Sequence, residues 1–322
     1  MKAVVVTALS DDLSGTGLAE VPEPCPAPGE ILVEVRAAAL NHPDLLMTRG
    51  AYQLKPPLPF VPGMEVAGTV LSADPGSGFA AGDEVVCATR LGGLAERVAC
   101  PEGAVRPLPR GLDPVRAAAA GTAYLTAYVA LVRLAAVRPG EWVLVHGASG
   151  GVGLAAVDLA KALGARVIAT SRSAAKLRAI AERYAVDATC RATGFREEVK
   201  DLTGGGADIV FDPVGGDTFD ESARCIAFGG RLLVVGFTSG RIAEVATNIP
   251  LIKGFSVIGV RAGEYVRRFP DRGREDRETV WSMIAAGRVA PHVDRAYPLS
   301  EWREAFAAMG RGDMVGKLVI EP

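Results

Sequence analysis

Histidine and closely spaced cysteine are scarce in this chain, and neither sign of charge is in excess. Three histidines occur among 322 residues, and the five cysteines lie far apart without a CxxC pair. Structural zinc sites and disulfide frameworks need such residues in close groups, so we expect neither. A net charge of −2 supplies no basic surface for nucleic acid and no acidic tail for a basic partner.

Long apolar runs are also absent. No uncharged apolar stretch approaches the roughly 20 residues of a membrane span. The opening MKAVVVTAL gives way to Ser10, Asp11 and Asp12 too soon for a secretory signal. A hydrophobic fraction of 49% and a charged fraction of 22% are typical of a globular protein. We expect a cytoplasmic protein with reduced thiols and no membrane partner.

The pattern of expected strands and helices divides the chain into two parts. Short β-type segments such as EILVEVRAAA and GDEVVCAT, separated by Pro and Gly turns, fill the first part. From about Val115 an Ala-rich helical run leads into apolar strands that alternate with helices, from WVLVHG to FSVIGVR. This alternation predicts a doubly wound parallel sheet, and the length favours two domains. The mixed-charge stretch EYVRRFPDRGREDRE that follows is expected to be a solvated surface segment.

The most specific motif is VLVHGASGGVGLAAVDLAKALGARVIATSRS, residues 143–173. An apolar strand runs into a glycine-rich turn that opens a helix, and a second strand follows. Such spacing permits a tight turn, close approach of backbone N–H groups to a pyrophosphate, and close packing of the helix on the strand. The alternative is a glycine-rich turn that binds nothing. We predict dinucleotide binding, with the pyrophosphate held by Gly147, Ser149, Gly150, Gly151, Val152 and Gly153.

The end of the second strand distinguishes NADPH from NADH. NAD-binding sites usually place Asp or Glu there to hold the ribose 2′-hydroxyl. This chain has Ser171, Arg172 and then Lys176 instead. A hydroxyl, a guanidinium and an ammonium attract a 2′-phosphate that a carboxylate would repel, so NADPH is favoured. Alternatively, Arg172 and Lys176 only solvate the start of a helix.

These motifs, taken together, resemble the zinc-independent (zeta-crystallin-like) quinone oxidoreductases of the medium-chain dehydrogenase/reductase superfamily. The resemblance extends over essentially the whole chain. It rests on Asn41-x-x-Asp44, RGAYQLKPPLPFVPGMEVAG (49–68), LTAYVAL (125–131), GASGGVG (147–153), FDPVGG (211–216) and VVGFTSG (234–240).

The resemblance implies a fold and an assembly. A GroES-like catalytic domain is expected over residues 1–118, completed by residues 264–322. A Rossmann NADPH-binding domain is expected over residues 119–263, with the active site in the cleft. A homodimer is also implied, in which FSVIGVR (255–261) pairs across the sheet edge, because an apolar edge strand otherwise needs covering.

The stretch LNHPDLL (40–46) bears on metal binding. Zinc alcohol dehydrogenases of the same superfamily use a cysteine, a histidine and a second cysteine as ligands. The resemblance puts Asn41, Met64 and Thr122 at those positions, and the four-cysteine structural lobe is missing. Catalytic zinc takes three protein ligands from N, S or carboxylate groups, which these side chains do not supply. We predict no metal, and we expect His42 to pack in the wall of the active-site cleft.

Without a Lewis acid, alcohol oxidation is disfavoured and hydride transfer to a quinone or a reactive α,β-unsaturated carbonyl is favoured. The resemblance implies Tyr52, in the RGxY stretch, as a donor to the developing oxygen. Asn41 and Thr126 are the other predicted catalytic residues. A phenol is protonated at neutral pH and can donate. Alternatively, Tyr52 only shapes the pocket, and Asn41 is a turn residue before a helix.

Further cofactor contacts are carried over from the resemblance. Arg191 stands where related enzymes often have a tyrosine near the adenosine phosphate, which adds positive charge. The loop of Gly236, Phe237, Thr238 and Ser239 is expected near the nicotinamide ribose. Arg261 and Lys317 either contact the cofactor or are ordinary surface charges.

The predicted activity is that of an NADPH:quinone reductase-type oxidoreductase. Two alternatives stay open. One is reduction of an enoyl thioester carried by CoA or a carrier protein. The other is an NADPH-binding protein with little turnover, like relatives that serve as lens structural proteins or bind RNA. The slightly acidic charge argues against nucleic acid, and the set of cofactor residues argues against a structural role.

Overall fold

The computed structural model describes residues 1–322, and internal contacts divide the chain into two compact units. The first combines Met1–Thr122 with Pro291–Pro322, and the second is Ala123–Ala290. Residues 264–290, which we expected in the first domain, make their contacts within the second unit. None of the helices is both long and apolar enough to cross a membrane.

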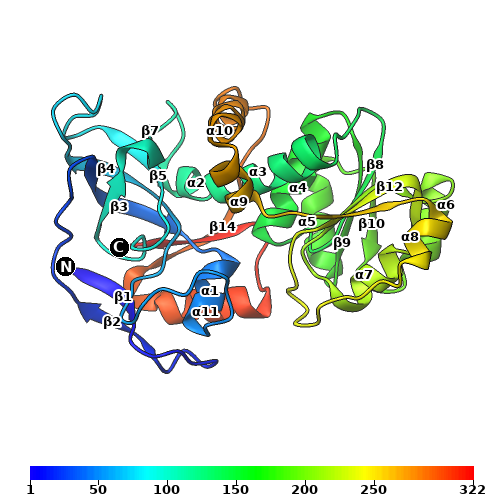
Figure 1. Ribbon diagram of the computed structural model, residues 1–322, viewed down its shortest axis with the longest axis horizontal. Coiled ribbons are helices and arrows are strands. Elements are labelled where there is room, and N and C mark those ends of the chain that lie inside the picture. The colour runs from blue at the N-terminus through cyan, green and yellow to red at the C-terminus, as the bar shows by residue number, and fades with distance from the viewer. The chain divides into compact units, whose positions relative to one another are not determined.

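The first unit is built on a largely antiparallel sheet in the order β14-β15-β3-β4-β5-β7, with β6 also paired to β3. Figure 1 labels β3, β4, β5, β7 and β14 of this sheet. A separate ribbon is formed by β1 (Lys2–Val6) and β2 (Thr16–Glu20). The strands of the main sheet are β3 (Glu30–Ala39), β4 (Glu65–Ser72), β5 (Glu84–Ala88), β6 (Arg97–Pro101), β7 (Val105–Pro107), β14 (Val293–Pro298) and β15 (Lys317–Glu321). The helical segments are α1 (His42–Thr48), η1 (Glu102–Ala104), α2 (Pro114–Ala118), η3 (Leu299–Glu301) and α11 (Trp302–Arg311).

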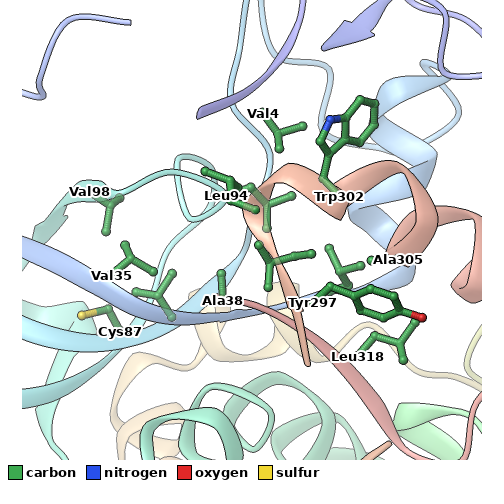
Figure 2. Packing of buried hydrophobic residues seen from close by; sticks show 14 of the residues in the cluster. Val4, Val35, Ala38, Cys87, Leu94, Val98, Tyr297, Trp302, Ala305 and Leu318 are labelled. Atoms are coloured by element: carbon green, nitrogen blue, oxygen red, sulfur yellow. The ribbon is translucent and has the colours of Figure 1, made fainter. Parts of the chain in front are cut away.

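Residues 291–322 supply part of the core of this unit. Strand β3 buries every second residue of its first half, as a strand with one face on a core requires. Figure 2 shows Val35 and Ala38 of β3 in the same cluster as Trp302 and Ala305 of α11 and Leu318 of β15. The C-terminal segment therefore completes the first unit, as the resemblance implied.

The second unit is a doubly wound sheet of parallel strands in the order β10-β9-β8-β11-β12-β13. The strands are β8 (Trp142–Val145), β9 (Arg166–Ser171), β10 (Ala188–Arg191), β11 (Ala207–Asp212), β12 (Ile226–Val234) and β13 (Ser256–Gly259). The helices are α3 (Gly121–Tyr128), the π-helical η2 (Val129–Leu134), α4 (Gly151–Ala162), α5 (Ala174–Tyr184), α6 (Arg196–Thr203), α7 (Gly216–Ser222), α8 (Asn248–Lys253), α9 (Ala262–Arg268) and α10 (Pro270–Ala285).

The strand order of the second unit fixes where a ligand would bind. From β8 the chain moves outward through β9 to β10, and then restarts at β11 and moves outward through β12 to β13. The order therefore reverses between β8 and β11. Ligands of such sheets bind at the carboxyl ends of the strands beside this reversal. The predicted fold, a GroES-like β-rich domain with a Rossmann domain, is confirmed.

Candidate active site

The glycine-rich turn lies at this reversal, directly after β8. Gly147 has a φ of +55°, a conformation that most residues avoid. A Cβ added at Gly153 would lie 2.2 Å from the Gly147 carbonyl oxygen, so a side chain at Gly153 would push the helix off the turn. At Gly150 the nearest such atom is at 3.4 Å, which is ordinary contact. The first and third glycines therefore shape the turn, and the middle one leaves room beside it.

The start of α4 has open hydrogen-bond donors. The first amides of any helix lack intrahelical acceptors, and the N-cap residue Gly150 provides no side-chain cap. The amides of Gly151, Val152 and Gly153 are thus suited to a phosphate, which the helix dipole also favours. These residues fit the pyrophosphate of a dinucleotide.

His146 directly precedes this turn and is held by hydrogen bonds to two neighbouring elements. The Ser222 hydroxyl donates to the Thr218 carbonyl (2.7 Å), so its oxygen accepts from His146 Nε2 (2.8 Å). His146 Nδ1 then accepts from the Thr170 hydroxyl (2.9 Å). Complete burial lowers the pKa of His146 to about 3. A neutral imidazole therefore links β8, β9 and α7, a role that the sequence did not reveal because Thr170 and Ser222 lie far along the chain.

The ends of β9 and β10 place the predicted 2′-phosphate residues close together. Arg191 pairs in register with Ser171, and Ala192 N donates to the Ser171 carbonyl (3.2 Å). Arg172 is exposed and Lys176 half-buried one turn further on. No carboxylate stands between these groups along residues 171–176. The structure thus gathers one hydroxyl and two guanidinium-bearing residues at neighbouring strand ends.

The loop after β12 is hydrogen-bonded to the loop after β11. Thr238 N donates to the Pro213 carbonyl (3.1 Å) and Ser239 N to the Val214 carbonyl (3.0 Å). Pro213 and Val214 in turn lie beside Gly147. Residues 236–239, with Phe237 exposed, therefore share one sheet edge with the glycine-rich turn. Arg261 is also exposed and begins α9 after the edge strand β13.

In the first unit, Asn41 and Lys317 belong to one buried polar cluster. Lys317 Nζ donates to Asn41 Oδ1 (2.7 Å) and Glu65 Oε1 (2.8 Å). Because lysine only donates, the Asn41 amide nitrogen must face the other way, where it donates to Glu65 Oε1 (3.0 Å) and the Ala39 carbonyl (3.2 Å). Both amide hydrogens therefore have acceptors within the protein. Asn41 is revised from a substrate donor to a residue that holds Glu65, and Lys317 is a buried partner of Glu65 and no surface charge.

Glu65 and Asp44 extend this cluster. Glu65 Oε2 accepts from Thr122 N (2.7 Å). Asp44 accepts from the backbone N–H groups of Asn41 (2.8 Å) and Gly63 (2.9 Å). Burial raises the pKa of Asp44 to about 7, although these two bonds oppose the shift. A role for Glu65, which bonds to Asn41, Lys317 and the Thr122 amide, was not predicted from the sequence. Its position directly after Met64, a position matched to a zinc ligand, could have indicated that role.

The residues present do not fit zinc. Of the positions that the resemblance matched to zinc ligands, Asn41 donates to Glu65 through its side chain and Thr122 through its backbone N–H. Met64 precedes Glu65 in the chain, and its side chain packs against the buried cluster that contains Met47. The three positions offer an amide, a thioether and a hydroxyl, and an ammonium already binds the carboxylate. Nowhere in the chain do three or more His, Cys, Asp or Glu side chains form a group that could hold a metal ion.

Tyr52 lies in the loop after α1. It is half-buried and packs with Leu54, Met64 and Leu91 against a buried cluster that contains Met47. Its hydroxyl makes no hydrogen bond within the protein. Thr126 is half-buried on α3 and belongs to the second unit. The structure thus associates Tyr52 with Met64, next to Glu65, and places Thr126 in a different unit.

Comparison with known proteins identifies the family. Residues 27–110 match the model of the alcohol dehydrogenase GroES-like domain, and residues 151–285 match that of the zinc-binding dehydrogenase. The quinone oxidoreductase-like protein 2 homolog of Nematostella vectensis is 36% identical over 299 residues, which is 90% of this chain and 81% of that protein. The chain belongs to the medium-chain dehydrogenase/reductase superfamily.

Solved structures support the same conclusion. The quinone oxidoreductase of Thermus thermophilus, solved also in complex with NADPH, has a TM-score of 0.88 and 34% identity, with 100% of both chains covered. A mycobacterial protein complexed with NADPH has a TM-score of 0.92 and 30% identity, again over 100% of both chains. The comparisons support an oxidoreductase of this family that uses a nicotinamide dinucleotide.

Proposed function

We propose that this chain is an NADPH-dependent reductase that transfers hydride to a quinone or a reactive α,β-unsaturated carbonyl without zinc. The arrangement around Glu65 carries the proposal. The matched ligand positions hold an amide, a thioether and a hydroxyl, and the cation bound to Asn41 and Glu65 is Lys317. An alkoxide would find no Lewis acid among these groups, whereas a conjugated acceptor spreads its developing charge and needs less help.

Residues of the second unit bind the cofactor, which supplies the hydride when bound. The amides at the start of α4 hold the pyrophosphate. Ser171, Arg172, Lys176 and Arg191 hold the 2′-phosphate, because guanidinium groups form paired bonds with phosphate oxygens. The loop 236–239 and Arg261 contact the nicotinamide half. The names of the Thermus and mycobacterial structures, both with NADPH, support this preference.

Residues of the first unit receive the acceptor. Tyr52 has an unbonded hydroxyl beside the apolar side chains of Leu54, Met64 and Leu91. A flat conjugated ring suits such a surface, and the phenol can donate to the oxygen that gains charge. Thr126 stays a second proposed catalytic residue. The name of the human quinone oxidoreductase, which is 31% identical over 306 residues, agrees with this substrate class.

We also propose a cytoplasmic homodimer formed along β13. This strand is the edge of its sheet, and apolar side chains around it are exposed: Phe228 by 87%, Leu251 by 80% and Ile252 by 73%. Unpaired edge strands with apolar neighbours need covering. A second copy can pair its own β13 with this one about a two-fold axis.

The deciding experiment compares NADPH and NADH oxidation with 1,4-benzoquinone, 9,10-phenanthrenequinone and crotonyl-CoA, each with and without EDTA. We expect quinone turnover that prefers NADPH and resists EDTA. The Tyr52→Phe variant should lose kcat and keep its NADPH affinity, since only the donor hydroxyl is removed. Faster turnover of crotonyl-CoA would reassign the chain to enoyl-thioester reduction. NADPH binding without any turnover would leave a binding protein, and EDTA inhibition would contradict the zinc-free mechanism.

A further inference from the structure

Asp158 lies midway along α4, the helix that begins with the glycine-rich turn, but has no part in the proposed cofactor contacts. Its side chain is buried, with 8% of the residue exposed. A single oxygen, Oδ2, accepts two hydrogen bonds, from the Tyr124 hydroxyl (2.5 Å) and from the backbone N–H of Ala290 (2.7 Å).

These two donors occupy special places in the chain. Tyr124 is the second residue of the second unit, and Ala290 is its last. The chain therefore enters and leaves this unit beside one carboxylate oxygen. Ala290 is held a second time, because the Tyr184 hydroxyl of α5 donates to its carbonyl (3.3 Å).

The contacts at Asp158 are built to persist. Burial and the charge of Asp158 raise the pKa of Tyr124 well above 10, so this hydroxyl keeps its proton and always donates. Hydrogen bonds to a carboxylate are shorter and stronger than those between neutral groups. A carboxylate buried for packing alone would be disfavoured by desolvation, which leaves its two bonds as the reason for its place.

We propose that Asp158 is a positioning residue that fixes both covalent connections of the cofactor-binding unit to helix α4. A ligand bound at the glycine-rich turn then also stabilises these connections. Asp158 follows Gly151 by about two turns of one rigid helix. The inference rests on the proposed dinucleotide site at the start of α4.

Hydrogen exchange of the full chain, with and without NADPH, tests this proposal. In the wild type we expect the amide of Ala290 and those of residues 123–127 to be protected, and to gain protection with NADPH. In Asp158→Ala this gain should vanish, and exchange at Ala290 should rise about ten-fold because its N–H loses its buried acceptor. In Tyr124→Phe the gain should vanish at residues 123–127, which lose their bond to Asp158. NADPH affinity, read from its bound fluorescence, should change less than about two-fold, because the turn itself is intact.

Two control variants separate anchoring from general stability. Asp158→Asn keeps an oxygen acceptor and should retain most of the protection at Ala290. Val199→Ala removes buried volume on α6 and should lower the melting temperature without selective exchange at the connections.

Faster exchange spread through the whole unit in Asp158→Ala, matching Val199→Ala, would overturn the proposal, and so would unchanged exchange at Ala290. If the wild type does not bind NADPH, the proposed function and the coupling fail together. Exchange at Ala290 without NADPH still reports whether Asp158 anchors the connections.

Discussion

At the scale of single residues, charge at the ends of β9 and β10 should decide between the dinucleotides. Arg172 and Arg191 flank Ser171, which pairs in register with Arg191. We expect Arg172→Ala/Arg191→Ala to lower kcat/KM for NADPH by roughly 10- to 100-fold, because bonds to charged groups contribute about 1.5–3 kcal/mol. The value for NADH should stay within about two-fold, since NADH lacks the 2′-phosphate.

Arg178→Ala is the matched control for this experiment. Arg178 is exposed on the same helix as Lys176 and has no role in the proposed site, so its loss should leave both values unchanged. Equal losses with NADPH and NADH in the double variant would count against a 2′-phosphate site.

The buried pair of Lys317 and Glu65 should be costly to break from one side only. Lys317→Met leaves the Glu65 carboxylate buried without its cation. Urea unfolding should show a loss of about 3–5 kcal/mol, and Glu65→Gln/Lys317→Met should recover most of it because neither half of the pair is left as an unpaired buried charge. Lys200→Met, at an exposed pair with Glu197, should cost less than about 1 kcal/mol. A loss of unfolding free energy for Lys317→Met as small as that for Lys200→Met would refute the cluster's structural role.

Residue types were more predictable than their partners. Lys317 was recognisable as a residue of interest from GKLVIEP, but its pairing with Asn41 and Glu65 joins positions 276 and 252 residues apart. No local pattern encodes such a contact. His146 was missed for the same reason, because its donor Thr170 lies on β9 and its acceptor Ser222 on α7.

At the scale of elements, the edge strand β13 should join two copies of the chain. Leu251 and Ile252 are exposed on α8, and Phe228 rests against Gly254 just before β13. We expect Leu251→Arg/Ile252→Arg to convert a dimer into a monomer in light scattering, because two buried cations per copy would lose their water. Leu202→Arg, at a leucine of α6 that is exposed by 40%, should stay dimeric. A monomeric wild type would rule out the proposed assembly.

Elements with a strong local signal were predictable, and those stabilised by distant charges were not. The strand, turn and helix of residues 143–162 followed from glycine spacing and apolar periodicity, and the structure has β8 and α4 there. The stretch after Arg261 was expected to be a solvated surface segment, and most of its residues are exposed, but its folding into α9 and α10 was not predicted. On α10, Asp276 is fully buried and accepts from Arg133 Nε (2.8 Å) of η2. That partner lies 143 residues away, so the charge pattern alone did not reveal the buried pair.

At the scale of the whole molecule, His146 should make stability depend on pH. Its pKa is about 3 in the folded chain because of burial, against 6.5 ordinarily. The unfolded chain therefore binds a proton that the folded chain does not as pH falls from 6.5 towards 3. The stabilisation from His146 is complete above pH 6.5 and is lost below it by about 1.4 kcal/mol per pH unit.

Comparison with His146→Gln, which is neutral throughout, isolates this effect. The wild type minus variant difference in unfolding free energy should shrink by about 2 kcal/mol between pH 6.5 and pH 5. Asp44 cancels in the difference, although its pKa of about 7 works in the opposite direction. A difference that does not change with pH would mean that the folded chain tolerates a protonated His146.

Strand β15 has a consequence for how the protein is made. It lies between β14 and β3 in the sheet of the first unit, and its Lys317 binds Asn41 and Glu65. On the ribosome, residues 123–290 emerge before this strand does. The second unit can thus fold while the N-terminal strands are still exposed, because their partner strand β15 is synthesised later. Chaperones would meet the nascent chain at that stage, with the hydrophobic faces of β3 and β4 as their natural target.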